Sequence, residues 1–168
     1  SGTLARLLIG ILSTTPNISV IMKGDHSLNK RNMKKLIEVM SRFGAEFLPK
    51  NKFNFPLKMI SSEMPVAINF KAGVSAQIKS AVMFAGLNSY GNTRIIEKKL
   101  SRDHTENILS KSKNIIKINN KDKRIITIFG KNYLKAINIK VPSDPSSAAF
   151  FTALTLLKKN SGLKIKNV

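Results

Sequence analysis

The fold is most clearly indicated by residues 73–87, which read GVSAQIKSAVMFAGL. A long apolar stretch without a polar face is typical of a helix buried beneath a sheet. Its polar residues Ser75, Gln77 and Lys79 all lie near its beginning. A helix N-terminus carries unpaired N–H groups and a partial positive charge, which suit a phosphate or carboxylate. The segment therefore predicts an anion site on a rigid helix; an ordinary capped core helix is the alternative.

Helix and strand patterns alternate along the rest of the chain. Apolar residues at helical spacing predict further helices over 3–12, 33–43, 105–112 and 144–158. Short apolar and β-branched runs predict strands at 18–22, 45–48, 57–61, 66–70, 93–97, 115–118, 124–129, 136–140 and 163–168, with a hairpin turn at 119–122. The order helix, strand, helix and three strands occurs twice, over 3–70 and 75–140, which indicates an α/β protein with a weak structural repeat.

Composition narrows the function classes. Among 168 residues, Lys and Arg number 29 against 9 acids, a net charge of +20. The lysines are scattered through a sequence rich in Lys, Asn and Ile, which favours a compositional bias, with some attraction of anionic ligands, over a nucleic-acid-binding face. The absence of cysteine excludes disulfides and thiolate metal sites, and His26 and His104 have no partners at metal-ligand spacing, so we expect no metal. No apolar run is long enough to span a bilayer and no secretory signal is visible, so we expect a cytoplasmic protein, or a plastid one if the source is a plant.

Five segments together resemble the enolpyruvyl transferases, most closely the branch that acts on shikimate-3-phosphate. Besides residues 73–87 they are SGTLARLL (1–8), GDHSLNKR (24–31), SRDHTEN (101–107) and VPSDPSSAAFF (141–151), in the order that the family has them. The resemblance implies an inside-out α/β barrel of βαβαββ units in two domains, with the helices packed inside. We expect residues 1–140 to hold two units of one domain and residues 141–168 to begin the crossover into the second.

The same resemblance implies a function and a set of binding residues. The family transfers the enolpyruvyl group of phosphoenolpyruvate to the 5-hydroxyl of shikimate-3-phosphate and releases phosphate, as a monomer without a cofactor. The residues that match its shikimate-3-phosphate pocket are Ser75, Ala76, Gln77, Ser101 and Arg102, and those that match its phosphoenolpyruvate pocket are Gly2 and Arg31.

The chain is expected to be an internal fragment. Its first residue already lies within a family motif, and the predicted strand at 163–168 has no partner after it. The family's proton-transferring Lys, Asp and Glu fall outside these 168 residues. We therefore expect no catalytic residue in this chain and no turnover by the chain alone.

Several residues near the expected site permit more than one interpretation. Asn32 stands where the family usually has Pro, which stiffens the loop that carries Arg31. Some relatives have Ala in place of Gly2 and resist glyphosate, so Gly2 predicts a glyphosate-sensitive pocket. Arg6 could bind substrate or be a buried structural arginine. We interpret His104 as a positioning or structural residue rather than a general base, because the family's proton-transferring groups lie elsewhere.

Two rival functions remain open. The UDP-N-acetylglucosamine enolpyruvyl transferases share the fold and chemistry, but they usually carry a Cys in the loop before the arginine, where this chain has GDHS at 24–27. A basic nucleic-acid-binding module is a candidate from another class. It would use residues 111–140, which are rich in Lys and contain Arg124, Phe129 and Tyr133; charge is its main support.

Overall fold

A computed structural model describes residues 1–121, 123–141 and 143–166. The chain forms two compact units, residues 1–135 and 136–168, and each is described by itself. The first unit contains, in chain order, α1 (Gly2–Leu12), β1 (Ser19–Met22), α2 (His26–Asn29), α3 (Lys34–Ser41), β2 (Glu46–Leu48), β3 (Leu57–Ile60), β4 (Asn69–Ala72), α4 (Ala76–Asn88), β5 (Asn92–Glu97), α5 (His104–Leu109), β6 (Ile116–Asn119) and β7 (Arg124–Phe129). The described residues of the second unit contain the helix α6 (Pro145–Leu157).

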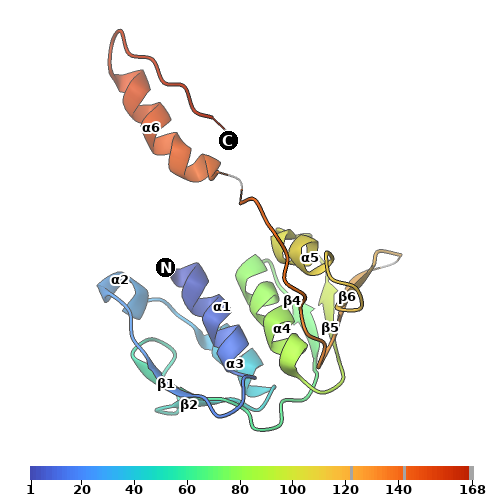
Figure 1. Ribbon diagram of the computed structural model, residues 1–168. Helices are drawn as coiled ribbons and strands as arrows, with labels where there is room; N and C mark the ends of the chain where they lie inside the picture. Colours follow the sequence, from blue (N-terminus) through green and yellow to red (C-terminus); the bar gives the residue numbers. More distant parts are fainter. Residues whose placement is uncertain (122, 142, 167–168) are drawn as a thin grey trace. The chain divides into compact units, whose positions relative to one another are not determined.

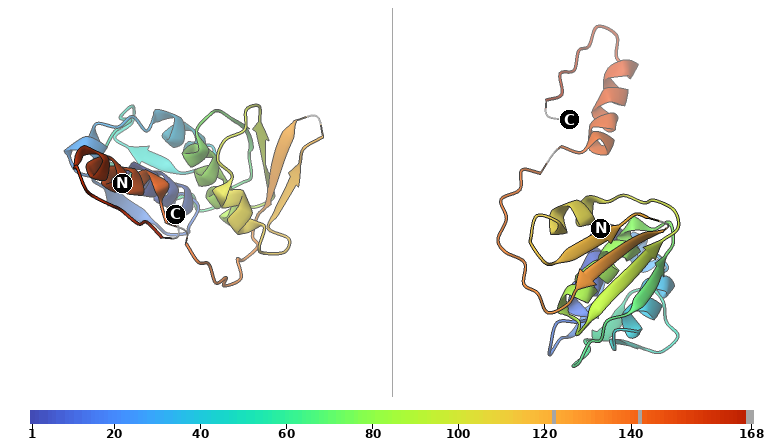
Figure 2. Two further views of the ribbon diagram at one scale, coloured as in Figure 1. Left: turned by 90° about the horizontal axis from the view of Figure 1, so that it is seen from above. Right: turned by 90° about the vertical axis from the view of Figure 1, so that its right-hand side faces the viewer.

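The strands of the first unit form two sheets. One is a three-stranded antiparallel sheet in the order β1-β3-β2. The other has four strands in the order β4-β5-β7-β6, in which only β4 and β5 are parallel. Figure 1 shows α1 and α4 side by side between these sheets, and Figure 2 shows the four-stranded sheet from a second direction. The two helices therefore lie between the sheets, with α4 mostly buried and one side of α1 exposed.

The packing of α1 against α4 places the N-termini of the two helices at the same end of the unit. A Cβ on Gly10 of α1 would lie only 2.5 Å from the carbonyl oxygen of Ala81 in α4, so the two backbones touch where glycine allows it. Nearer the beginning of both helices, Gln77 of α4 bonds Thr3 of α1. The helices therefore run parallel, with their N-termini at the same end of the unit.

One hydrophobic core joins the helices to both sheets. Eight of the thirteen residues of α4 are buried, which confirms the prediction of a helix enclosed by apolar neighbours. Fully buried side chains from the surrounding elements complete the core: Ile9, Leu36, Met40, Phe43, Met59, Met83, Ile95, Ile126 and Ile128. Burying each such side chain contributes about 1.5–3 kcal/mol, so the platform beneath the helix N-termini is rigid.

The strand predictions at three positions were wrong. The strand expected at 66–70 forms at 69–72, and Val66 makes only a single bridge with Tyr90. Residues 136–140 and 163–166 have no strand structure, and 167–168 lie outside the described residues. A strand needs a hydrogen-bonding partner, and the described residues offer none to either segment.

The position of β4 also changes the limits of the repeat. β4 belongs to the second sheet, so β4, α4, β5, α5, β6 and β7 form one βαβαββ unit that begins at residue 69 rather than 75. The preceding elements lack the leading strand of such a unit within the described chain.

The predictions of short helices, turns and helix caps were confirmed only in part. The short helix α2 was not expected, and Asp122 of the predicted hairpin turn and Pro142 of the 141–151 motif lie outside the described residues. The caps predicted for the last helix are confirmed, because the Asp144 carboxylate accepts a hydrogen bond from the backbone N–H of Ser146 at 2.9 Å. Across the described parts of both units, no helix combines the length and the apolar character needed to cross a membrane.

Candidate functional site

The N-termini of α1 and α4 are capped by serines. The hydroxyl of Ser1 accepts from the backbone N–H of Leu4, and the hydroxyl of Ser75 accepts from that of Ile78, each at 3.4 Å. In this role a serine oxygen uses its lone pairs, and its hydroxyl hydrogen stays available. Ser75 can therefore cap α4 and donate to an anion at the same time.

Gln77 connects the beginnings of the two helices. Its amide nitrogen donates to the Thr3 hydroxyl at 2.8 Å, and its amide oxygen accepts from the Arg6 guanidinium at 2.8 Å. Arg6 donates further to the Gly2 carbonyl at 3.1 Å. These bonds fix both the Gln77 amide and the Arg6 guanidinium, and one amide hydrogen of Gln77 remains for a ligand.

Two guanidinium groups converge on Gly2. A Cβ built on Gly2 would lie 2.5 Å from Nη1 of Arg31 and 3.1 Å from Nη1 of Arg6. Neither arginine takes part in an ion pair among the described residues. Burial, and after it the charge of Arg31, lowers the pKa of Arg6. Paired arginines without a carboxylate between them are suited to a bound oxyanion.

The loop that carries Arg31 is held by hydrogen bonds from its own side chains. Asp25 accepts from the N–H of Leu28 at 2.7 Å, and Asn29 accepts from that of Gly24 at 2.9 Å. Asn32, where the resemblance led us to expect Pro, accepts from the N–H of Lys34 at 2.8 Å. The asparagine therefore orders the entry to α3 by a hydrogen bond from its own side chain.

Two hollows meet at Gln77. One, of about 390 Å³, is lined by Arg6, Ser75 and Gln77 together with residues of α3. The other, of about 220 Å³, includes Ala76, Gln77 and Arg102 in its lining, together with Thr3 and His104. The structure thus brings six of the seven predicted binding residues to the common end of α1 and α4: Gly2, Arg31, Ser75, Ala76, Gln77 and Arg102.

Ser101 is engaged differently from the other six. Its hydroxyl donates to Oε1 of Glu97 at 2.7 Å, and its backbone N–H donates to the same oxygen at 2.9 Å. A serine has one hydroxyl hydrogen, so this bond excludes simultaneous donation to a ligand.

Lys79 is not the ligand-facing ammonium that the sequence pattern indicated. Its side chain is fully buried, with Nζ 2.6 Å from Oε1 of Glu106 and 2.9 Å from Oε1 of Glu97. At position 79 the helix has turned toward α5 and β5, so the ammonium lies in the interior. This part of the prediction was wrong, because position along a helix does not by itself give direction.

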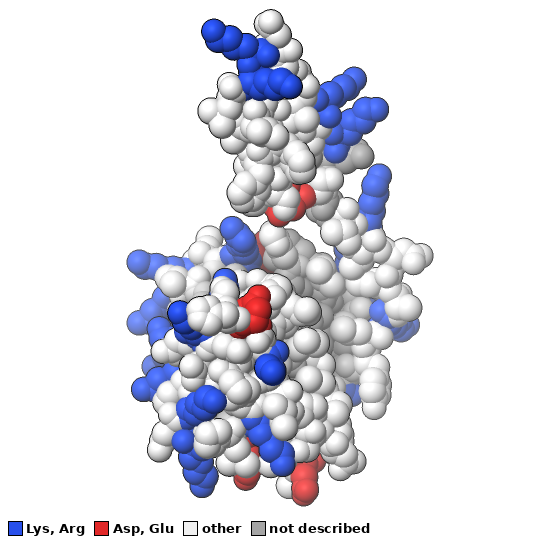
Figure 3. Space-filling model, turned by 90° about the vertical axis from the view of Figure 1, so that its left-hand side faces the viewer, with Lys and Arg blue, Asp and Glu red and all other residues white. Residues whose placement is uncertain are grey.

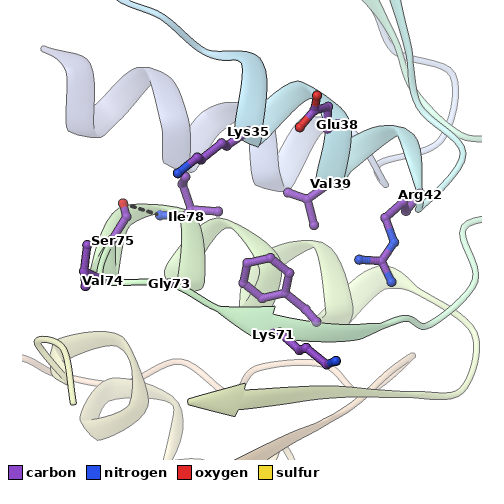
Figure 4. Close-up of a pocket in the computed structure, with 10 residues that line it drawn as sticks. Lys35, Glu38, Val39, Arg42, Lys71, Gly73, Val74, Ser75 and Ile78 are labelled. Carbon is purple, nitrogen blue, oxygen red and sulfur yellow. Dashed lines mark hydrogen bonds between the residues drawn. The ribbon is translucent and has the colours of Figure 1, made fainter. Parts of the chain in front are cut away.

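A third hollow, of about 440 Å³, lies on the other side of Ser75. Figure 4 shows Lys35 extending from α3 toward Ile78, and Arg42 extending from the end of α3 toward β4. Arg42 donates to the carbonyl of Asn69 at 2.6 Å. Because Lys35 lines this hollow and the 390 Å³ hollow, basic groups surround the beginning of α4 on two sides.

The prediction from sequence omitted Thr3 and left the role of Arg6 open. Both lie on one face of α1, three residues apart, and both bond Gln77. That spacing on a predicted helix was the available signal.

Comparison with known proteins identifies the family of the chain. A sequence model of the family described as "EPSP synthase (3-phosphoshikimate 1-carboxyvinyltransferase)" matches residues 1–168. Curated relatives named 3-phosphoshikimate 1-carboxyvinyltransferase include those of Paramagnetospirillum magneticum, 39% identical over 171 residues, and Novosphingobium aromaticivorans, 41% identical over 171 residues. In both cases the match covers 100% of this chain and 38% of the relative, so the chain spans about two fifths of their length.

Solved structures lead to the same family. The structure of EPSP synthase from Acinetobacter baumannii matches 92% of this chain and 34% of its own, with a TM-score of 0.77 and 35% identity. This likeness confirms the predicted α/β fold class. The matched names also favour the shikimate-3-phosphate branch over the UDP-N-acetylglucosamine branch. The chain therefore belongs to the EPSP synthase family.

Proposed function

We propose that this chain is part of a synthase that transfers the enolpyruvyl group of phosphoenolpyruvate to the 5-hydroxyl of shikimate-3-phosphate and releases phosphate. One observation carries the proposal. Gln77 lies between Arg6 on one side and Arg102 on the other, at the junction of two hollows. None of the ion pairs among the described residues involves either arginine. Two phosphorylated substrates that must react need separate cationic subsites on either side of a neutral group.

The hollow that contains Arg102 is assigned to shikimate-3-phosphate. In this hollow Arg102 would bind the phosphate, the backbone at Ala76 would add helix N–H donors, and Gln77 would bond a ring hydroxyl. Ser75 lines the adjoining hollow, so its hydroxyl would have to reach the phosphate past Gln77. Ser101 joins this set only if its hydroxyl turns from Glu97 toward the phosphate.

The Gly2 side is assigned to phosphoenolpyruvate. Arg31 and Arg6 form a pair of guanidinium forks above Gly2, which suits a carboxylate or a phosphate bound by two parallel hydrogen bonds. The absence of a Gly2 side chain lets the Arg31 guanidinium lie close to the helix backbone, beside that of Arg6. The proposal leaves proton transfer to residues outside this chain, and the chain alone is expected not to turn over.

The same proposal gives the chain its place in the longer protein. The unit from β4 to β7 and the preceding helices and strands would form about two repeats of one domain, and residues 141–168 would begin the crossover into the second. We place the reaction in the cytoplasm, because both substrates are phosphorylated and do not diffuse through membranes. We expect the longer protein to be a monomer.

The surface charge supports substrate attraction. Figure 3 shows Lys and Arg side chains spread widely over one face, with few acids among them. A scattered positive field raises the encounter rate with polyanions without creating a single nucleic-acid-binding track. Association with either substrate should therefore slow as salt rises, because the Debye length falls to about 8 Å at physiological ionic strength.

The test uses the full-length protein. Phosphate release should require both substrates, and UDP-N-acetylglucosamine should not replace shikimate-3-phosphate. Arg102→Ala should raise KM for shikimate-3-phosphate at least tenfold, and Arg31→Ala should do so for phosphoenolpyruvate. Arg94→Ala, an exposed arginine on β5, is the matched control and should change neither. Release of phosphate without shikimate-3-phosphate, or equal effects of all three substitutions, would contradict the proposal.

A further inference from the structure

Four charged side chains meet inside the first unit, away from both substrate hollows. Lys79 from α4, Glu97 from β5 and Glu106 from α5 have fully buried side chains, and Arg124 from β7 is 18% exposed. Arg124 lies 3.4 Å from Oε2 of Glu97 and 3.7 Å from Oε1 of Glu106. Two cations and two anions thus form a neutral cluster, called here the buried charge cluster, that joins four elements.

Such a cluster is weak evidence of a purely stabilising role. Removing charges from water is costly, and well-packed apolar residues often stabilise a core as well or better. Oε2 of Glu106 and Nε of Arg124 also have no hydrogen-bond partner among the described residues. The contacts that the cluster makes outside itself therefore indicate what it does.

The cluster reaches the substrate site through one carboxylate oxygen. Oε1 of Glu97 accepts from Lys79 at 2.9 Å and also from both the N–H and the hydroxyl of Ser101. Burial would raise the pKa of Glu97, but the bonds from Lys79 and Ser101 outweigh it and keep that pKa below its ordinary value. Glu97 is thus a charged acceptor that fixes the backbone immediately before Arg102.

A second connection fixes the helix on the other side of Arg102. Lys79 holds Glu106 of α5 at 2.6 Å, and the hydroxyls of Ser80 and Thr105 lie 2.8 Å apart. Both links join α4 to α5, and Ser80 and Thr105 also line the hollow that contains Ala76 and Arg102. The exposed Arg102 is therefore held between two anchored residues, although its own side chain makes no ion pair with a described residue.

We propose that the buried charge cluster is a positioning device: through Glu97 and Ser101 on one side and Glu106 on the other, it holds Arg102 in place for the phosphate of shikimate-3-phosphate. Lys79 and Glu97 act through other residues and do not touch substrate. The assignment of Arg102 to that phosphate rests on the proposed function, whereas the anchoring of residues 98–103 does not.

The experiment compares full-length Glu97→Asp with the wild type. This change keeps the charge balance of the cluster but withdraws the carboxylate by one methylene from Ser101. Amide hydrogen exchange in residues 98–103 should become at least tenfold faster. The Kd for shikimate-3-phosphate should rise at least tenfold, while KM for phosphoenolpyruvate and kcat at saturation change less than threefold.

Ile126→Val is the matched control, because Ile126 is a fully buried core residue on β7 that contacts neither substrate hollow. It should lower the melting temperature without changing exchange in residues 98–103 or the Kd. If Glu97→Asp fails to fold, Arg124→Gln replaces it, because Arg124 lies at the edge of the cluster. Arg124→Gln should increase both the amide exchange in residues 98–103 and the Kd for shikimate-3-phosphate approximately threefold.

The outcomes separate this proposal from the proposed function. Unchanged exchange in residues 98–103 would overturn the positioning role, whatever the substrate. Faster exchange with an unchanged Kd, in a protein that binds shikimate-3-phosphate, would overturn the link to Arg102. A wild type that binds no shikimate-3-phosphate but shows the exchange effect would overturn the proposed function and leave the anchoring intact.

Discussion

Replacing Gly2 with alanine tests the phosphoenolpyruvate subsite most directly. The added methyl would lie 2.5 Å from Nη1 of Arg31, which is 0.9 Å short of the 3.4 Å of ordinary contact. The obstructing atom is the far end of a flexible side chain, so Arg31 should move by about that distance and the helix should stay in place. Alanine also favours the helix by up to about 1 kcal/mol relative to glycine.

Gly2→Ala should therefore weaken phosphoenolpyruvate binding rather than lower the free energy of unfolding. A charge-assisted hydrogen bond is worth about 1.5–3 kcal/mol. Misaligning one fork of Arg31 by nearly an ångström should cost about 1.4 kcal/mol, which is a tenfold rise in KM for phosphoenolpyruvate. KM for shikimate-3-phosphate should change less than threefold. The assay is phosphate release by the full-length protein at varied concentrations of each substrate.

The same variant tests the expected response to glyphosate. The wild type should be inhibited, and Gly2→Ala should need a higher inhibitor concentration for the same effect. Thermal unfolding of both proteins supplies the structural control. An unchanged KM for phosphoenolpyruvate, or a fall in melting temperature of many degrees, would refute the reasoning that the methyl displaces only the end of Arg31.

Three further predictions concern the supporting structure. Gly10→Ala should lower the free energy of unfolding by about 1–3 kcal/mol, measured by urea denaturation, because its methyl would meet the backbone of Ala81 rather than a flexible side chain. Ser75→Asp should keep the α4 cap and change stability by less than about 1 kcal/mol, yet weaken shikimate-3-phosphate binding in titration calorimetry by repelling the phosphate. The pKa of Glu97 is lowered from 4.5, so its charge stabilises the fold above that pH and loses this effect as pH falls through the folded-state pKa. The difference in unfolding free energy between the wild type and Glu97→Gln should therefore shrink below pH 4.5, and a difference that grows there would contradict the sign.

Local sequence patterns predicted the helices better than the strands. The helix at 75–87 was recognisable because its apolar character and its Ser75 cap are both local properties. The strand expected at 136–140 has the same local character as β4, but β4 finds β5 as a partner and residues 136–140 find none among the described residues. A strand depends on a distant partner, which a local pattern does not contain.

In the candidate site, too, local sequence predicted residue types but not every side-chain contact, because some contacts depend on distant residues. The residue types needed for anion binding at the beginning of α4 were visible in the sequence, and Gln77 lies where they predicted. The burial of the Lys79 side chain could not be predicted from local sequence, because it depends on ion pairs with Glu97 and Glu106. These residues lie 18 and 27 positions further along the chain and approach Lys79 only in the folded unit. The resemblance to a family supplied Arg31 and Arg102, which spacing alone would not have connected to residue 77.

The close contact of Gly10 with Ala81 has a consequence for how the protein responds to solution anions. It holds two parallel helices with their N-termini together, and each terminus carries about half a positive charge. The two ends repel each other, and Arg6 and Arg31 add to that repulsion. An oxyanion bound there would act as the counter-ion of the helix pair, so a ligand that binds more tightly should also raise the melting temperature more. Simple divalent oxyanions such as sulfate should protect this region from heat even though they take no part in the reaction.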